Sequence, residues 1–177
     1  RGPLRIRNFN GTKATPIVIR NDANGSTPAV LRSSSGDSAG FVLHCENCTG
    51  VVIDGSAKWK GASSGRTYGI KLTVAGGKSP SAFLKMAGKS RLFTIRNVEI
   101  DGAWPAISNN GSGISVNDHA VKRSVNPGLW REGIVIEDNY IHHVAKEGMY
   151  IGPNYADGGL PLRDVVIRNN LVEDTGW

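Results

Sequence analysis

Apolar and polar residues follow a nine-residue pattern that occurs three times, as TIRNVEIDG (94–102), VIEDNYIHH (135–143) and VIRNNLVED (166–174). In each copy two apolar residues lie five positions apart, on either side of an Asn or Asp: Ile95 and Ile100, Ile136 and Ile141, Ile167 and Val172. The pattern predicts two short strands joined at a polar corner, because Asn and Asp tolerate the left-handed backbone of a tight bend. Recurrence at intervals of 41 and 31 residues indicates the stacked coils of a solenoid.

A second motif, Gly-Φ-x-Φ with Φ an apolar residue, occurs at 69–72, 113–116 and 148–151 and alternates with the first. We therefore expect each coil to hold one Gly-Φ-x-Φ strand, a loop of variable length, and the two strands around the polar corner. Strands are also expected in the less regular amino-terminal third, at 4–8, 16–21, 29–32, 41–43 and 51–55. Strands this short, without intervening helices, exclude a doubly wound α/β sheet.

These elements predict an all-β fold, a right-handed parallel β-helix that forms a single domain over residues 1–177. The 23 glycines and the many Asn, Asp and Ser residues suit its turns, whereas Ile, Val and Leu suit its strands. We expect irregular coils over 1–60 and regular coils over 61–177, with long loops at 74–92, 118–132 and 153–163.

Stacking the coils about 4.8 Å apart would place equivalent residues above one another in columns. The expected columns are a corner column of Asn97, Asp138 and Asn169, an outward column of alternating charge with Arg96, Glu137 and Arg168, and a third with Asp54, Asp101, His142 and Glu173. In the third column His142 would lie between two carboxylates, which favours its imidazolium form. This column is either an acid–base device or a solvated ladder of ion pairs, and the sequence leaves both open.

The net charge of +6 favours acidic partners. The Lys and Arg residues are scattered instead of forming a stripe interleaved with aromatic residues, so we expect no nucleic acid as a partner, whereas acidic glycans fit the charge. Cys45 and Cys48 form a lone Cys-x-x-Cys, for which a local disulfide or two buried thiols are better explanations than a zinc or redox site.

The chain contains no run of about 18 apolar residues, so no transmembrane segment is expected. It opens at Arg1 without a signal peptide and stops at Trp177 directly after a predicted strand. Because a solenoid needs caps at its ends, we expect the chain to be a fragment of a longer protein.

The chain also resembles a known family. The segment NFNGTKATPIVIRN (8–21) is similar to the opening of many secreted bacterial β-helix proteins, including alginate lyase and chondroitinase B-like enzymes. The segments NYIHH (139–143), EGMYIG (147–152) and TGW (175–177) resemble pectate-lyase-type right-handed β-helix repeats. The resemblance covers nearly the whole chain and implies a secreted or cell-surface protein. Its motifs describe coil geometry and are shared by lyases, hydrolases, epimerases and adhesins, so they assign no catalytic residue.

We therefore expect an exported protein that binds or cleaves an acidic polysaccharide, and any catalysis would be β-elimination by a polysaccharide lyase. A lyase needs a base and a cation that stabilises an enolate-like intermediate, for which calcium is a candidate cofactor. The candidate bases are Lys122, Arg123 and His142, the candidate calcium ligands are Asp118 and Glu147, and the candidate substrate contacts are His119, Trp130, Arg131, Tyr150 and Tyr155.

The alternative is a non-catalytic module, either a cell-surface adhesin or a structural subunit of an exported assembly, whose partner is a cell-surface or secretion-apparatus protein. Aromatic loop residues that stack on sugars or on a protein partner would serve this role equally well. A glycoside hydrolase would need two carboxylates at a set separation, for which Asp101 and Glu173 are candidates.

Overall fold

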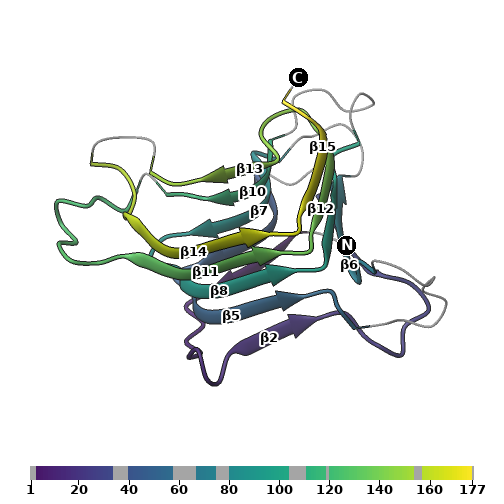
Figure 1. Cartoon of the computed structure of the whole chain (residues 1–177), viewed down its shortest axis with the longest axis horizontal. Coiled ribbons are helices and arrows are strands. Elements are labelled where there is room, and N and C mark those ends of the chain that lie inside the picture. The colour runs from purple at the N-terminus through teal and green to yellow at the C-terminus, as the bar shows by residue number, and fades with distance from the viewer. Residues whose placement is uncertain are drawn as a thin grey trace.

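The computed structural model describes residues 3–33, 40–57, 67–74, 80–103, 111–118, 120–153 and 157–176. The regular elements of these residues are β-strands, and they form three parallel sheets of five strands each (Figure 1). Each coil of the chain contributes one strand to each sheet in turn. The fold is therefore the all-β parallel β-helix that the repeats predict. Within the described ranges no helix is long and apolar enough to span a bilayer.

We call the three sheets A, B and C. Sheet A consists of β1 (Leu4–Arg7), β4 (Phe41–Glu46), β7 (Ala82–Ala87), β10 (Ser112–Val116) and β13 (Met149–Ile151). Sheet B consists of β2 (Ile17–Arg20), β5 (Thr49–Asp54), β8 (Arg91–Arg96), β11 (Arg131–Glu137) and β14 (Leu162–Arg168). Sheet C consists of β3 (Ala29–Ser33), β6 (Ile70–Val74), β9 (Val98–Asp101), β12 (Tyr140–Val144) and β15 (Leu171–Thr175).

The core lies between the three sheets and is built from columns of apolar side chains. In sheet B, Ile53, Ile95 and Ile136 are in register on successive coils, and all three are fully buried. Corresponding columns line sheet A and sheet C. Because side chains of a strand alternate between its two faces, the residues between these apolar positions point outward. Function must therefore be sought in the outward columns and in the connections.

The corner between sheets B and C follows the predicted pattern. Asn97, Asp138 and Asn169 have φ angles of 53°, 55° and 55°, in the left-handed region that Asn and Asp tolerate. The two strands of each nine-residue repeat are thus consecutive strands of sheets B and C.

Cys45 and Cys48 are buried free thiols, which is one of the two explanations expected from the sequence. The hydrogen bond between them raises the pKa of Cys45 and lowers that of Cys48.

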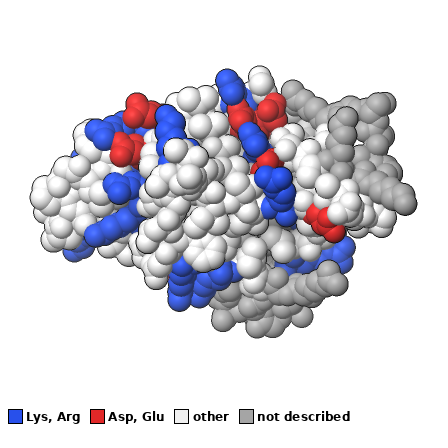
Figure 2. Space-filling model, turned by 90° about the horizontal axis from the view of Figure 1, so that it is seen from below, with Lys and Arg blue, Asp and Glu red and all other residues white. Residues whose placement is uncertain are grey.

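The predicted column of alternating charge is present on sheet B. It consists of Arg20, Asp54, Arg96, Glu137 and Arg168. Arg96 donates to Asp54 at 2.9 Å, and Arg168 lies 2.6 Å from Glu137. Burial alone would raise the pKa of Asp54, but hydrogen bonds from Arg96 and Ser56 lower it to about 2. In Figure 2, which views the molecule from below, rows of alternating basic and acidic side chains cross the surface.

Three sequence predictions need correction. Asp54 does not belong to the column of Asp101 and His142, because it ends β5 in sheet B, and Thr73 pairs with Asp101 instead. The range 74–92, expected as a loop, contains the whole of β7. The Gly-Φ-x-Φ segment at 69–72 overlaps β6 of sheet C, whereas the segments at 113–116 and 148–151 overlap β10 and β13 of sheet A.

Candidate functional site

The outward face of sheet A carries a column of polar side chains that crosses all five strands. The parallel register places Arg5, His44, Lys85, Ser115 and Tyr150 side by side on successive coils. The neighbouring positions of the same strands, such as Leu84 of β7 and Ile114 of β10, are buried in the core. Strand alternation thus explains why the polar side chains lie together on the face of the sheet that points away from the core.

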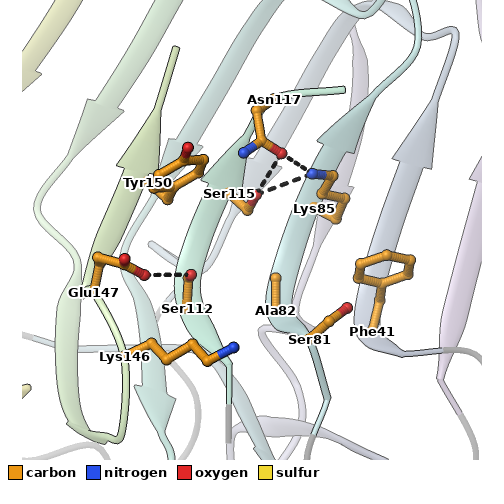
Figure 3. Close-up of a pocket in the computed structure, with 10 residues that line it drawn as sticks. All are labelled: Phe41, Ser81, Ala82, Lys85, Ser112, Ser115, Asn117, Lys146, Glu147 and Tyr150. Atoms are coloured by element: carbon orange, nitrogen blue, oxygen red, sulfur yellow. Dashed lines mark hydrogen bonds between the residues drawn. The ribbon is translucent and has the colours of Figure 1, made fainter. Parts of the chain in front are cut away.

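A groove of about 370 Å³ lies over the middle of this column (Figure 3). Its lining residues are Phe41, Ser81, Ala82, Lys85, Ser112, Ser115, Asn117, Lys146, Glu147 and Tyr150. They come from β4, β7, β10 and β13 and from the connections beside these strands, so the groove exists only when four coils are stacked. In Figure 3, Lys85, Ser115, Asn117 and Tyr150 lie along one side of the groove, and Lys146 and Glu147 lie toward its other side.

Lys85 is the central cation of the groove. Its Nζ donates to Ser115 Oγ at 3.1 Å and to Asn117 Oδ1, and Ser115 Oγ also donates to Asn117 Oδ1 at 3.1 Å. Burial lowers the pKa of Lys85 to about 8, an effect that the negative charge of Asp118 opposes and the positive charge of Arg131 reinforces. Lys85 is therefore mainly an ammonium ion at neutral pH and loses its proton only slightly above it.

Arg131 and Asp118 lie beside this cation and bind the turn after β7. The Arg131 guanidinium donates to the backbone oxygen of Gly88 at 2.5 Å, and Asp118 accepts the backbone N–H groups of Gly88 at 2.6 Å and of Ala120 at 2.8 Å. Arg131 is only 1% exposed, and burial lowers its pKa to about 10. The structure therefore places Arg131, an expected substrate contact, beneath the surface, where it binds the turn after β7 and does not line the groove.

One wall of the groove is formed by the connection between β12 and β13, which contains Lys146 and Glu147. Glu147 Oε2 accepts a hydrogen bond from Ser112 Oγ at 3.0 Å, which ties this connection to β10. The expected calcium ligands Asp118 and Glu147 thus have different hydrogen-bond partners, and calcium binding by them stays a prediction. Tyr150 and Glu147 are the two predicted site residues that line the groove.

The structure does not bring the three expected catalytic residues together. Lys122 and Arg123 are exposed in the connection between β10 and β11, which an antiparallel bridge from Lys122 to Gly158 holds against the connection between β13 and β14. His142 lies on β12 of sheet C, at the other side of the molecule in Figure 1. Residues that lie near one another along the chain can belong to different faces of a solenoid, because each coil passes through all of its faces.

The remaining expected substrate contacts lie apart from the groove or outside the described residues. Trp130 is exposed just before β11, with the guanidinium of Arg163 5.4 Å from the centre of its ring, a cation–π contact. His119 and Tyr155 fall outside the described residues.

His44 adjoins the groove as the neighbour of Lys85 on β4. Its ring centre lies 4.6 Å from that of Phe41, which lines the groove. Burial lowers the pKa of His44, so the ring is neutral at pH 7. Neither ring nitrogen has a hydrogen-bond partner among the described residues. Both nitrogens are buried, so His44 packs beneath Phe41 and the aromatic surface at this end of the groove belongs to Phe41.

The predicted position of His142 is confirmed on sheet C. His142 is in register with Asp101 on one side and Glu173 on the other, as the repeats indicate. Its ring stacks on that of Tyr140 with 4.1 Å between ring centres, and the Tyr140 hydroxyl donates to Glu173. The outward face of sheet C is thus a second polar cluster, separate from the groove on sheet A.

Comparison with known proteins adds no relative to this picture. The chain matches no protein-family model, and neither a search of curated proteins nor a search of solved structures finds a significant match.

Proposed function

We propose that the chain binds an acidic polysaccharide in the groove on sheet A. The observation that carries this proposal is Lys85, a partly buried ammonium group that lies in an open groove beside the neutral side chains of Ser115 and Asn117. The groove also holds a second cation, Lys146, and one anion, Glu147, whose carboxylate is bound by Ser112. A uronate polymer presents one carboxylate and several hydroxyl groups on each sugar. Lys85 would bind the carboxylate, while Ser115 and Asn117 would bind hydroxyl groups.

The shape of the site supports a linear ligand. The groove crosses strands of four successive coils, so it runs along the axis of the solenoid. Tyr150 and Phe41 lie near its two ends and offer ring faces on which sugars can stack. The resemblance to secreted pectate-lyase-like proteins agrees with this ligand class, and we include an exported, cell-surface or secreted location in the proposal.

Binding is expected to weaken as the pH rises through about 8, because Lys85 then loses its charge. The measurement is calorimetric titration of the protein with polygalacturonate, alginate and chondroitin sulfate at pH 6.5 and pH 9.5, with dextran as the neutral control. We expect Lys85→Ala to bind at least about tenfold more weakly at pH 6.5, the loss of one charge-assisted hydrogen bond. Lys85→Arg should bind at both pH values, because a guanidinium stays charged.

The matched control is Lys13→Ala, which removes one positive charge from an exposed position before β2. It should bind like the wild-type chain. Equal losses in Lys13→Ala and Lys85→Ala would mean that net charge alone attracts the polymer, and the groove would be rejected as its site. Equal affinity for dextran would reject acidic recognition.

A second candidate function, β-elimination, is favoured by the lowered pKa of Lys85, because a base works best when its pKa is near the operating pH. Neutral Lys85 would remove the proton from C5 of a uronate. The electron pair of that C–H bond would form the C4–C5 double bond, and the C4–O bond would break, with the departing oxygen taking a proton. Tyr150 is a candidate donor of that proton on the same groove.

This candidate is tested by the absorbance of unsaturated uronates in the same mixtures, with and without calcium. An absorbance rise that Lys85→Ala abolishes, and that Lys122→Ala and Arg123→Ala leave intact, is expected for a lyase with its base in the groove. A rise that depends on Lys122 or Arg123 would move the base to the β10–β11 connection. No rise with retained binding would favour the non-catalytic role of an adhesin or assembly subunit.

A further inference from the structure

The outward face of sheet C brings two imidazoles and a carboxylate together. Asp101 ends β9 and pairs with His142 of β12. The next residue, His143, has a φ of 53°, so the backbone there departs from the alternation of a strand. As a result the two consecutive rings meet, with 2.7 Å between His142 Nδ1 and His143 Nδ1. The three residues therefore form one cluster, although sequence order would send neighbouring strand residues to opposite faces.

The spacing of the three donor atoms suits a small divalent ion. Asp101 Oδ1 lies 3.9 Å from His142 Nδ1 and 3.6 Å from His143 Nδ1. In a tetrahedral zinc site with bonds of about 2.0–2.1 Å, neighbouring ligand atoms are roughly 3.3–3.4 Å apart. The three edges of 2.7, 3.6 and 3.9 Å bracket this value, so changes of roughly 0.2–0.7 Å in these distances would complete the geometry.

The far nitrogens of both rings face carboxylates. His142 Nε2 lies 3.2 Å from Glu99 Oε1, and His143 Nε2 lies 3.7 Å from Asp174 Oδ2. A neutral imidazole carries one N–H, and an acceptor beside Nε2 holds it there, which leaves the lone pair on Nδ1. Carboxylates in this position orient histidine ligands in many metal sites. The hydrogen bond of 2.7 Å between the two Nδ1 atoms requires a proton on one of them in the metal-free chain. A divalent ion that displaces this proton would meet the lone pairs of both Nδ1 atoms beside Asp101.

Lys71 fixes the acidic side of the cluster. Its Nζ lies 2.7 Å from Glu99 Oε1 and 3.0 Å from Asp101 Oδ2. The ion pair with Lys71 uses the second oxygen of Asp101, whereas Oδ1 faces the two rings and accepts the backbone N–H of Ala103 at 3.0 Å, which fixes its position. The carboxylates are thus positioned before any ligand arrives, which lowers the entropic cost of binding.

From this geometry we infer that Asp101, His142 and His143 bind a divalent transition-metal ion of the zinc class through His142 Nδ1, His143 Nδ1 and Asp101 Oδ1. Two nitrogen donors favour zinc, cobalt, nickel or copper, whereas calcium and magnesium require oxygen ligands. The His143 side chain is 42% exposed, so an ion can reach the cluster from solvent. Three protein ligands with one open position are the arrangement of zinc sites that bind an exchangeable water or substrate.

The test uses zinc chloride and cobalt chloride added to the chelator-treated protein. We expect one zinc ion per chain by calorimetric titration, and visible absorption bands of tetrahedral cobalt on cobalt addition. Asp101→Asn and His143→Asn should each weaken zinc binding at least about tenfold. Asparagine is chosen at position 143 because it tolerates the left-handed backbone there. Circular dichroism checks that both variants keep the β fold.

Two further variants locate the ion. Asp174→Asn should weaken zinc binding by a smaller factor, because Asp174 only orients His143. Cys48→Ser should leave zinc binding unchanged, because the buried thiols of Cys45 and Cys48 are the competing soft ligands. Loss of binding in Cys48→Ser, unchanged binding in both Asp101→Asn and His143→Asn, or no binding by the wild-type chain would each overturn the inference.

Discussion

Replacing Asn139 with alanine is expected to lower the free energy of unfolding by about 3 kcal/mol or more, since each buried backbone group left unsatisfied costs about 1–3 kcal/mol. Asn139 is completely buried at the corner between sheets B and C. Its Nδ2 donates to the backbone oxygen of Ile95 at 3.0 Å, and its Oδ1 accepts the backbone N–H of Val98 at 3.0 Å. One side chain thus satisfies two groups of the coil below it, and alanine would leave both without a partner.

Urea denaturation followed by circular dichroism measures this loss. The matched control is Asn170→Ala, which removes the equivalent side chain one coil further on. Asn170 Nδ2 donates to the backbone oxygen of Ile136 at 2.9 Å and its Oδ1 accepts the backbone N–H of Asn139 at 3.1 Å, but Asn170 is only partly buried, so water can replace the lost bonds. We expect a loss of about 1 kcal/mol for this control. Equal losses for the two variants would mean that the corner hydrogen bonds, and not their burial, determine the effect.

Replacing Gly55 with alanine is expected to cost about 3 kcal/mol, the upper part of the range for overpacked sites. A Cβ at position 55 would lie 2.0 Å from the backbone oxygen of Asn97 and 2.9 Å from the backbone nitrogen of Ile70. Neither atom can rotate away. The Gly55 N–H donates to the backbone oxygen of Arg96 at 3.0 Å, so a shift of the backbone would also break a hydrogen bond between coils.

The control for this variant is Gly25→Ala in the connection between β2 and β3. There the nearest atom to a new Cβ, the backbone oxygen of Asp22, is 3.3 Å away, and the segment is largely exposed. We expect a change within about 0.5 kcal/mol. Thermal unfolding compares the two variants. A Gly55→Ala chain that unfolds at the wild-type temperature would show that the two coils can separate at this corner without cost, contrary to the close approach of Gly55 and Asn97.

The regular coils could be predicted because their corners are marked in the sequence. Each nine-residue repeat contains its own bend, so counting from the corner gives the register of Ile95, Ile136 and Ile167, which the structure confirms. The same register gives the position of His142 between Asp101 and Glu173. Local backbone preference and coil stacking agree at these positions, and a sequence pattern is most reliable where they do.

Asp54 shows where the pattern fails. The segment VVIDG (51–55) has almost the same letters as VEIDG (98–102), yet the first belongs to sheet B and the second to sheet C. Both strands bury alternate apolar residues, and alternation is the same for every sheet of the helix. Only the pairing between coils distinguishes them, and the residues of neither segment indicate which strands it pairs with.

The groove on sheet A was harder to predict than the column on sheet C. Its central residue, Lys85, lies in the run AFLKMA (82–87), which lacks both repeat motifs, so the sequence gives no sign of the strand β7 that it forms. A lysine that interrupts an otherwise apolar run was the available signal, because such a residue in a buried strand must point outward. Tyr150 and Glu147 are easier to predict, because Tyr150 lies within a recognisable Gly-Φ-x-Φ segment and Glu147 directly precedes it.

The isoleucine column of sheet B also explains how such a protein can accept insertions and deletions during evolution. Ile19, Ile53, Ile95, Ile136 and Ile167 stack in register although 34, 42, 41 and 31 residues separate them along the chain. The length of a coil is therefore independent of the rise from one coil to the next. Insertions and deletions in the connections alter the surface and leave the interior contacts in place, so natural variation can remodel the groove walls while the scaffold that holds them is inherited unchanged.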